Sequence, residues 1–233
     1  METSYVVTAG GVRIAYAVTG AAGAPPLVAL HALGERGADW EQVAGQLAAH
    51  YRVYAPDLRG HGDSDWPGDY SPRLMRDDVL GFMDELNLPV VSLLGHSLGG
   101  VVALLIAMSQ QGRIERLIVE DVTPPYDRDP PPLPARPQEP AGFDWDMLAP
   151  IRAQASVRDD AAWAGLGSIT VPALLVGGGP GSHIPQELLA QAAAAMPDCT
   201  LVTIPAGHNV HRGRPAEFAG TVLGWLRAER AVS

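Results

Sequence analysis

A serine stands at the centre of a glycine-bounded motif, Gly95-His96-Ser97-Leu98-Gly99. Residues 90–94 before it are apolar and partly β-branched, which predicts a buried strand. Residues 98–110 after it are rich in Ala and Leu, which predicts a buried helix. A Gly-x-Ser-x-Gly pattern between a strand and a helix is typical of a nucleophile elbow, where the serine occupies a strained turn. We therefore predict that Ser97 is a nucleophile; the alternative is an ordinary helix-capping serine.

A serine hydroxyl is a weak nucleophile at neutral pH and needs a base beside it. Among the seven histidines, His208 follows the last predicted strand and precedes the last predicted helix. A loop in that position lies at the carboxyl edge of a parallel sheet, from which an imidazole can reach the elbow. We predict His208 as the base, and His211, three residues later, is the alternative.

The elements that must position these residues alternate between strands and helices. An opening hairpin is predicted over 5–8 and 12–18, joined by glycines. Further strands are predicted over 26–31, 52–55, 90–94, 114–119, 173–176 and 200–204, and helices over 39–49, 72–86, 98–110, 185–196 and 215–227. Ser71 is the expected N-cap of the second helix, with Pro72 in its first turn. This order predicts an α/β fold with a mostly parallel sheet and helices on both faces.

One stretch interrupts the alternation between residues 121 and 170. Its first part, up to Pro140, is crowded with proline and cannot form a regular helix or a central strand. Its second part, 143–166, can form one or two short helices. Because it carries large apolar side chains, we expect a folded insertion over the active-site edge rather than a disordered linker. We predict a core domain of residues 1–121 and 171–233, and a short cap or lid of residues 122–170.

The composition of the chain limits the kinds of partner that the protein can bind. The chain has 233 residues, 47% hydrophobic and 18% charged, as expected for one globular domain with a sizeable core. Its formal net charge of −10 argues against nucleic acid or an anionic membrane as a partner. No apolar run reaches transmembrane length, no secretory leader is visible, and the single Cys199 is interpreted as a small core residue. We expect a cytoplasmic protein, monomeric or homodimeric.

Four motifs together resemble the α/β-hydrolase fold family. They are the elbow, the run of residues 57–64 (Asp-Leu-Arg-Gly-His-Gly-Asp-Ser), the loop His31-Ala32-Leu33-Gly34 and the late Gly207-His208. The resemblance covers nearly the whole chain and is weakest over residues 122–170. It implies a triad in the order nucleophile, acid, histidine, which Ser97 and His208 fit. Relatives that open epoxides or dehalogenate alkanes carry aspartate at the elbow, so serine implies acyl transfer instead.

The acid is where the chain departs from the family. Most members place it after the strand that follows the insertion, but residues 177–183 contain no carboxylate. Some members place it after the strand that follows the nucleophile helix, where this chain has Glu120 and Asp121. We favour Asp121 as the triad acid, with Glu120 as the alternative. A dyad without an acid is the remaining possibility.

The resemblance also implies an oxyanion hole and a substrate pocket. The two backbone donors are expected at Leu98, after the nucleophile, and at Leu33. His31 is expected to hold that loop by hydrogen bonding. The predicted pocket is relatively open and apolar, with walls formed by Leu33 and by the residues His31, Ala32, Trp145, Met147 and Trp163.

We predict a serine esterase for small to medium hydrophobic esters, thioesters or lactones, without metal or cofactor. The glycine-rich residues 177–181 lack the Lys-Ser/Thr of a phosphate loop, and residues 57–64 are interpreted as a structural turn. Two other functions remain open: a slow or inactive ligand-binding receptor on the same fold, and a hydrolase of carbon–carbon bonds that uses the same triad.

Overall fold

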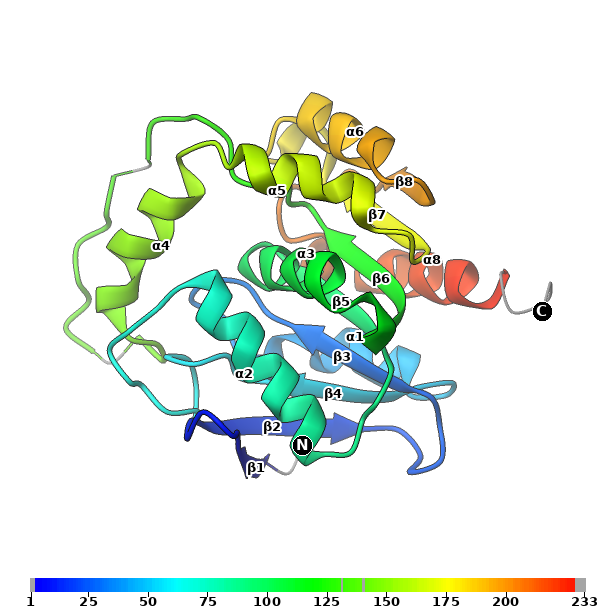
Figure 1. Cartoon of the computed structure of the whole chain (residues 1–233), viewed down its shortest axis with the longest axis horizontal. Coiled ribbons are helices and arrows are strands. Elements are labelled where there is room, and N and C mark those ends of the chain that lie inside the picture. The colour runs from blue at the N-terminus through cyan, green and yellow to red at the C-terminus, as the bar shows by residue number, and fades with distance from the viewer. Residues whose placement is uncertain (1–2, 131, 140, 229–233) are drawn as a thin grey trace.

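The computed structural model describes residues 3–130, 132–139 and 141–228. Within them, eight strands form one sheet in the order β1-β2-β4-β3-β5-β6-β7-β8 (Figure 1). The strands are β1 Thr3–Val7, β2 Arg13–Thr19, β3 Pro26–Leu30, β4 Arg52–Pro56, β5 Val91–His96, β6 Ile114–Glu120, β7 Ala173–Gly177 and β8 Cys199–Thr203. Among these strands, β2 runs opposite to the other seven: it pairs antiparallel with β1 and β4, and all other pairs are parallel. The predicted mostly parallel sheet with an opening hairpin is therefore confirmed.

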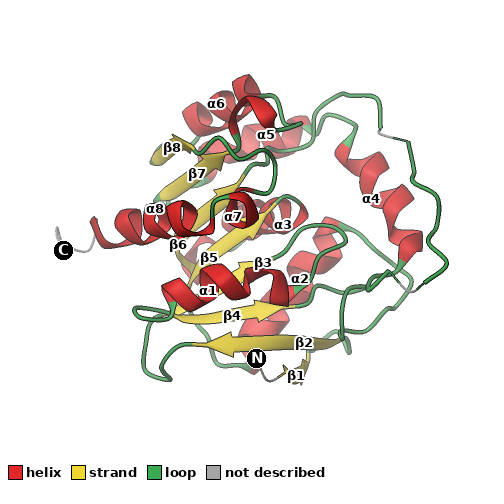
Figure 2. Ribbon diagram, turned by 180° about the vertical axis from the view of Figure 1, so that it is seen from behind, coloured by secondary structure: helices red, strands yellow, loops and turns green. Residues whose placement is uncertain are grey.

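Helices cover both faces of the sheet. They are α1 Glu41–Leu47, α2 Pro72–Glu85, α3 Leu98–Ser109, α4 Leu148–Ala155, α5 Asp160–Gly165, α6 Gln186–Ala195, α7 Val210–Gly213 and α8 Pro215–Ala228. Viewed from behind, α1 and α8 lie across one face, with α2 and α3 on the other side (Figure 2). The four-residue α7 was not predicted, because one turn leaves no periodic pattern in a sequence. The Ser71 hydroxyl caps α2 by accepting the Leu74 N–H at 3.2 Å, as predicted.

The two-residue period of the strands divides the core into two layers. In β3, Val28 and Leu30 point into the core under α2 and α3. Leu27 and Ala29 point into the core under α1 and α8. All six residues of β5 are buried, since this strand has neighbours on both edges and helices on both faces. The elbow thus begins from the most rigid part of the sheet.

The segment between β6 and β7, residues 122–170, is here called the cap segment. It contains α4 and α5, the one or two short helices expected in 143–166. In both views α4 lies beyond the carboxyl ends of the parallel strands (Figures 1 and 2). Met147, Leu148 and Ile151 are buried and anchor α4. No helix of the described residues is long and apolar enough to cross a membrane.

Candidate active site

Ser97 sits in a strained turn between β5 and α3. Its backbone has φ 49° and ψ −115°, a region that L-residues other than glycine rarely adopt. The turn needs glycine on both sides: a Cβ at Gly95 would overlap the carbonyl oxygen of Gly99, and a Cβ at Gly99 would overlap that of Leu30. The predicted elbow geometry is therefore present, and it leaves the Ser97 side chain facing a cavity at the carboxyl end of the sheet.

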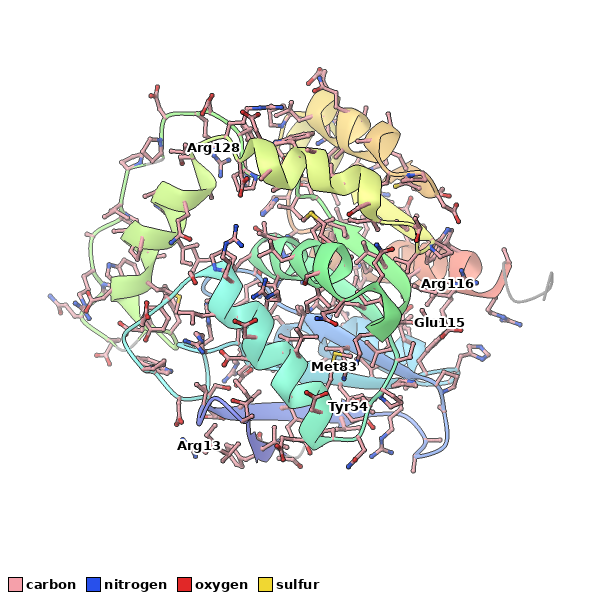
Figure 3. All side chains as sticks on the ribbon, in the orientation of Figure 1. Arg13, Tyr54, Met83, Glu115, Arg116 and Arg128 are labelled. Carbon is pink, nitrogen blue, oxygen red and sulfur yellow. The ribbon has the colours of Figure 1, made fainter. Side chains whose placement is uncertain are left out.

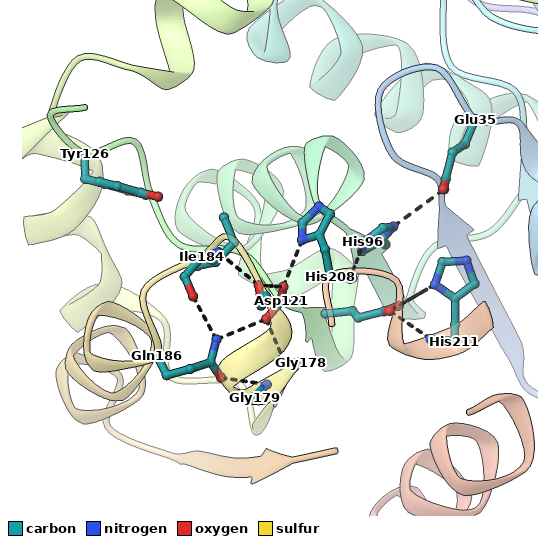
Figure 4. Close-up of polar contacts among 12 residues, drawn as sticks. Glu35, His96, Asp121, Tyr126, Gly178, Gly179, Ile184, Gln186, His208 and His211 are labelled. Carbon is teal, nitrogen blue, oxygen red and sulfur yellow. Dashed lines mark hydrogen bonds and ion pairs between the residues drawn. The ribbon is translucent and has the colours of Figure 1, made fainter. Parts of the chain in front are cut away.

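Asp121 and His208 form a hydrogen-bonded pair. Nδ1 of His208 lies 2.8 Å from Oδ2 of Asp121, and the Asp121 side chain is fully buried (Figure 4). Because a carboxylate only accepts, Nδ1 carries the proton and Nε2 is left as the acceptor. His208 and Ser97 line the same cavity. A serine and a carboxylate-oriented imidazole facing one cavity can carry out nucleophilic acyl transfer.

The loop after β7 completes the surroundings of Asp121 without supplying a carboxylate. The Gly178 N–H donates to Oδ1 at 2.7 Å, and the Ser182 hydroxyl donates to Oδ2. Burial alone would raise the pKa of Asp121, but the hydrogen bonds from His208, Ser182 and Gly178 lower it below its usual value. Asp121 is therefore held as an anion. Its own backbone has φ 46°, which turns the chain sharply after β6.

Glu120, the alternative acid, binds a different histidine. Its carboxylate accepts the backbone N–H of His211 at 2.9 Å and the ring Nδ1 of the same residue at 2.9 Å. Both side chains are buried, and neither lines the cavity that contains Ser97. The structure thus separates the two carboxylates and the two histidines into two pairs.

A buried polar cluster lies behind the His208 loop. Nε2 of His96 donates to the His208 carbonyl at 2.9 Å, and Nδ1 of His96 lies 3.5 Å from Glu35 (Figure 4). Burial lowers the pKa of His96, but the nearby carboxylates of Glu120 and Glu35 outweigh it and raise the pKa. Glu35, His96 and His211 could together ligate a metal ion, although Arg212 already forms an ion pair with Glu35 at 3.3 Å.

The two predicted oxyanion donors are at the cavity wall. Leu33 and Leu98 both line the cavity. Leu98 begins α3, so its N–H has no partner within the helix. Among the described residues, no acceptor is recorded for the Leu33 N–H. Both N–H groups are thus available to a ligand oxygen.

Two buried histidines fix the loop that carries Leu33. Nε2 of His31 accepts the Leu58 N–H at 2.9 Å, and Nε2 of His61 accepts the Gly34 N–H at 3.1 Å. Burial lowers the pKa of His31 to about 4 and that of His61 to about 3, so both rings are neutral near pH 7. His31 therefore has the loop-holding position expected for it.

The cavity that contains Ser97 and His208 has a volume of about 720 Å³. Its apolar wall is formed by side chains of the elbow, the strand ends and the cap segment, namely Leu33, Leu98, Val101, Val122, Ile151 and Ile184. Leu33, which was predicted as a wall residue, is one of these side chains. The other predicted wall residues do not line this cavity.

Those five predictions are wrong for physical reasons. His31 and Ala32 are buried and do not line the cavity. Met147 is fully buried, close to Gly60 and Tyr70. Trp145 lines a separate surface cavity, stacked on Phe143. Trp163 packs against the core, and its Nε1 donates to the Pro125 carbonyl at 2.9 Å.

The cap segment and the loop after β7 supply wall residues that the sequence analysis missed. These are Tyr126, Arg128, Asp129, Arg152 and His183. The ring of His183 lies 4.1 Å, centroid to centroid, from that of His208. A proline-rich segment has no periodicity, so its sequence does not indicate which side chains turn inward.

Comparisons with known proteins agree with this geometry. A family model described as the alpha/beta hydrolase family matches residues 27–221. An uncharacterised protein of Mycobacterium tuberculosis is 35% identical over 113 residues, which covers 48% of this chain and 33% of that protein. A soluble epoxide hydrolase of Corynebacterium sp. is 35% identical over 123 residues, 52% of this chain and 42% of that protein. The matched region therefore spans less than half the length of these two relatives.

One solved structure resembles this chain over almost the whole length of both proteins. The crystal structure of a hydrolase from Pseudomonas aeruginosa superposes with a TM-score of 0.81 at 28% sequence identity. The superposition covers 97% of this chain and 98% of that one. The likeness therefore includes the cap segment as well as the sheet and its helices.

Proposed function

The chain belongs to the alpha/beta hydrolase family, and from that premise we propose that it is a serine hydrolase of carboxylic esters. The acyl group passes through an ester with Ser97, and thioesters and lactones can follow the same route. One observation carries the proposal: His208, whose Nδ1 is bound to the buried Asp121 at 2.8 Å, faces the same cavity as Ser97.

Acylation begins with proton transfer from Ser97 Oγ to Nε2 of His208 as Oγ attacks the ester carbonyl carbon. The carbonyl oxygen becomes an oxyanion, which the N–H groups of Leu33 and Leu98 bind. Asp121 stabilises the imidazolium because its carboxylate is already ionised and aligned with Nδ1. The imidazolium then protonates the leaving alcohol oxygen as the carbon–oxygen bond breaks, and acyl-Ser97 remains.

Deacylation repeats these steps with water. Nε2 of His208 removes a proton from a water molecule as the water oxygen attacks the acyl carbon. A second oxyanion forms at the same two N–H groups. Its collapse releases the carboxylic acid, and the proton on His208 returns to Ser97 Oγ.

The nucleophile argues against the activity named for the Corynebacterium relative. Family members that open epoxides use an aspartate at the elbow, because the carboxylate attacks carbon without losing a proton. This chain has Ser97 at that position. A serine that His208 deprotonates is suited to a carbonyl carbon, and we expect no epoxide turnover.

The test compares the wild-type protein with Ser97→Ala on the p-nitrophenyl esters of acetate, butyrate and octanoate. We expect kcat/KM to fall by about 10⁴-fold or more in the variant. Ser109→Ala is the matched control, since Ser109 lies on the same helix α3 with its hydroxyl bonded to the Leu105 carbonyl. A wild type that hydrolyses no ester, or a rate that Ser97→Ala leaves intact, would overturn the proposal. If the wild type hydrolysed styrene oxide but no ester, the protein would be an epoxide hydrolase.

A further inference from the structure

The cap segment places two guanidinium groups in the wall of the reaction cavity. Arg128 follows β6, Arg152 lies on α4, and both line the cavity that contains Ser97 and His208. Figure 3 shows Arg128 between α4 and α5. Within the described part of the chain, neither guanidinium forms an ion pair with a carboxylate. Two unneutralised cations in one cavity wall favour a negatively charged ligand.

Arg128 is held in place by an aromatic ring. Its guanidinium lies over the ring of Tyr126, 4.9 Å from the centroid, and its Nη1 donates to the Tyr126 hydroxyl at 3.0 Å. Its Nε is buried and has no acceptor among the described residues. A guanidinium fixed over a ring is prepared for an anion, because little side-chain freedom remains to be lost on binding.

Arg152 is held by the proline-rich part of the cap segment. Its Nη1 donates to the carbonyl of Pro132 at 3.0 Å. Ile151 and Ala155, on the same helix α4, also line the cavity. The helix therefore presents a positive charge and apolar surface side by side.

The nearby carboxylates do not cancel these charges. Asp127 and Asp129 flank Arg128 in sequence, but Asp127 does not line the cavity, and its carboxylate accepts the Arg158 backbone N–H at 2.8 Å. Among the described residues that line the cavity, Asp129 is exposed and is the one carboxylate. Two arginines against one aspartate make this wall positive in a chain whose formal net charge is −10.

We propose that the ester hydrolysed at Ser97 carries a carboxylate group, and that Arg128 and Arg152 bind it. This inference rests on the proposed ester hydrolysis. The substrate class is a half-ester of a dicarboxylic acid, or a lactone or ester with a free carboxylate. The apolar side chains of Leu98, Val101 and Ile151 contact the carbon chain between the ester and the carboxylate.

The first experiment uses two matched pairs of esters. Mono-p-nitrophenyl glutarate and p-nitrophenyl valerate differ by a carboxylate on the acyl side. The butyrate ester of 4-hydroxybutanoate and butyl butyrate differ by a carboxylate on the alcohol side. We expect kcat/KM to favour the charged member of at least one pair by about tenfold or more, since charge-assisted hydrogen bonds are strong. Added salt should reduce the preference.

A second experiment uses variants to test whether the two arginines cause the preference for the charged ester. Arg128→Gln and Arg152→Gln should each lower the charged-to-neutral ratio of kcat/KM by about fivefold or more, mainly through KM. Arg128→Lys keeps the charge and should retain part of the ratio, which separates charge recognition from a folding defect. Arg136→Gln is the matched control, because Arg136 lies in the same cap segment, pairs with Asp146 and lines a different cavity. It should leave the ratio unchanged.

The outcomes distinguish the two proposals. Turnover of neutral esters without preference in either pair would overturn the carboxylate site and leave the serine hydrolase standing. Absence of all ester turnover would overturn the proposed function. In that case calorimetric titration with glutarate tests the carboxylate site by itself. Glutarate that binds to the wild type and binds more weakly to Arg128→Gln and Arg152→Gln would support the site. Absence of glutarate binding to the wild type would overturn it.

Discussion

Glu120 and Asp121 are adjacent in the chain, yet their carboxylates bind different histidines. Asp121 accepts a hydrogen bond from Nδ1 of His208, and Glu120 from Nδ1 of His211. Glu120 ends β6, and Asp121 follows with a left-handed backbone, φ 46°. One strand end therefore orients the cavity histidine and also anchors the loop that carries it.

Because the two carboxylates bind different histidines, we expect one isosteric substitution to lower activity and the other to lower stability. Asp121→Asn should lower kcat by about 10⁴-fold while the protein remains folded, because an amide can hold His208 in the wrong tautomer. Glu120→Gln should act on stability, because it weakens the buried hydrogen bonds to His211, at a cost of about 1–3 kcal/mol. Ester hydrolysis and thermal unfolding of both variants measure the difference. If Glu120→Gln removed activity with its melting temperature unchanged, the assignment of the acid would be wrong.

The close packing of the elbow predicts that alanine in place of Gly99 lowers stability, whereas alanine in place of an exposed helical glycine raises it. A Cβ at Gly99 would overlap the backbone carbonyls of Leu30 and His31, which cannot move without disturbing β3. We expect Gly99→Ala to destabilise the fold by several kcal/mol, about 3 or more, as severe overpacking does. Gly224 lies on α8 with open space around it. Gly224→Ala should stabilise the protein by about 0.5–1 kcal/mol, as chemical denaturation would show.

The chain positions of the three candidate catalytic residues could be predicted because each follows a recognisable strand. Ser97, Asp121 and His208 come directly after β5, after β6 and in the loop after β8. Parallel strands bring their carboxyl ends to one edge, so strand order alone places these side chains near one another. The choice between Asp121 and Glu120 needed the hydrogen-bond partner of each carboxylate, which a sequence does not display.

The cavity wall could not be predicted in the same way. Trp145 and Trp163 were chosen because they are large and apolar, but such side chains are equally suited to pack against neighbouring segments. Trp163 does so, with its indole N–H satisfied by Pro125. The residues that do line the cavity, such as Tyr126 and Arg128, lie in a proline-rich segment whose path depends on tertiary contacts.

Glu35 gives a prediction for the dependence of stability on pH. Burial alone would raise the pKa of Glu35, but the hydrogen bond and charge of His96 and the charge of Arg212 lower it from 4.5 to about 2. A carboxyl group whose folded-state pKa lies below its unfolded value stabilises the protein above the unfolded pKa. That contribution is lost as the pH falls through the folded pKa.

The free energy of unfolding of the wild type should therefore exceed that of Glu35→Gln by a margin that shrinks between about pH 5 and pH 2. The change should be at most about 3 kcal/mol. Glu41→Gln is the control, because Glu41 is exposed at the start of α1. Denaturant titrations at several pH values measure the margin. A margin that stays constant over this range would contradict the role given to His96 and Arg212.

The position of Val101 predicts how the cavity limits the acyl chain. Val101 lies on α3, one turn after Ser97, and lines the same cavity as Ser97. In Val101→Phe the larger ring should fill part of the space for a long acyl group, because the wall helix α3 is packed against β5 and cannot withdraw. We expect kcat/KM for p-nitrophenyl octanoate to fall by about tenfold or more, with a smaller change for the acetate ester.

Trp145→Ala is the matched comparison for this experiment, because Trp145 lines a different cavity beside Phe143. It removes a larger side chain than Val101→Phe adds, yet it should leave the ratio of octanoate to acetate hydrolysis unchanged. If Trp145→Ala altered that ratio while Val101→Phe did not, the acyl chain would lie against the outer part of the cap segment. The cavity above Ser97 would then be the exit path of the alcohol.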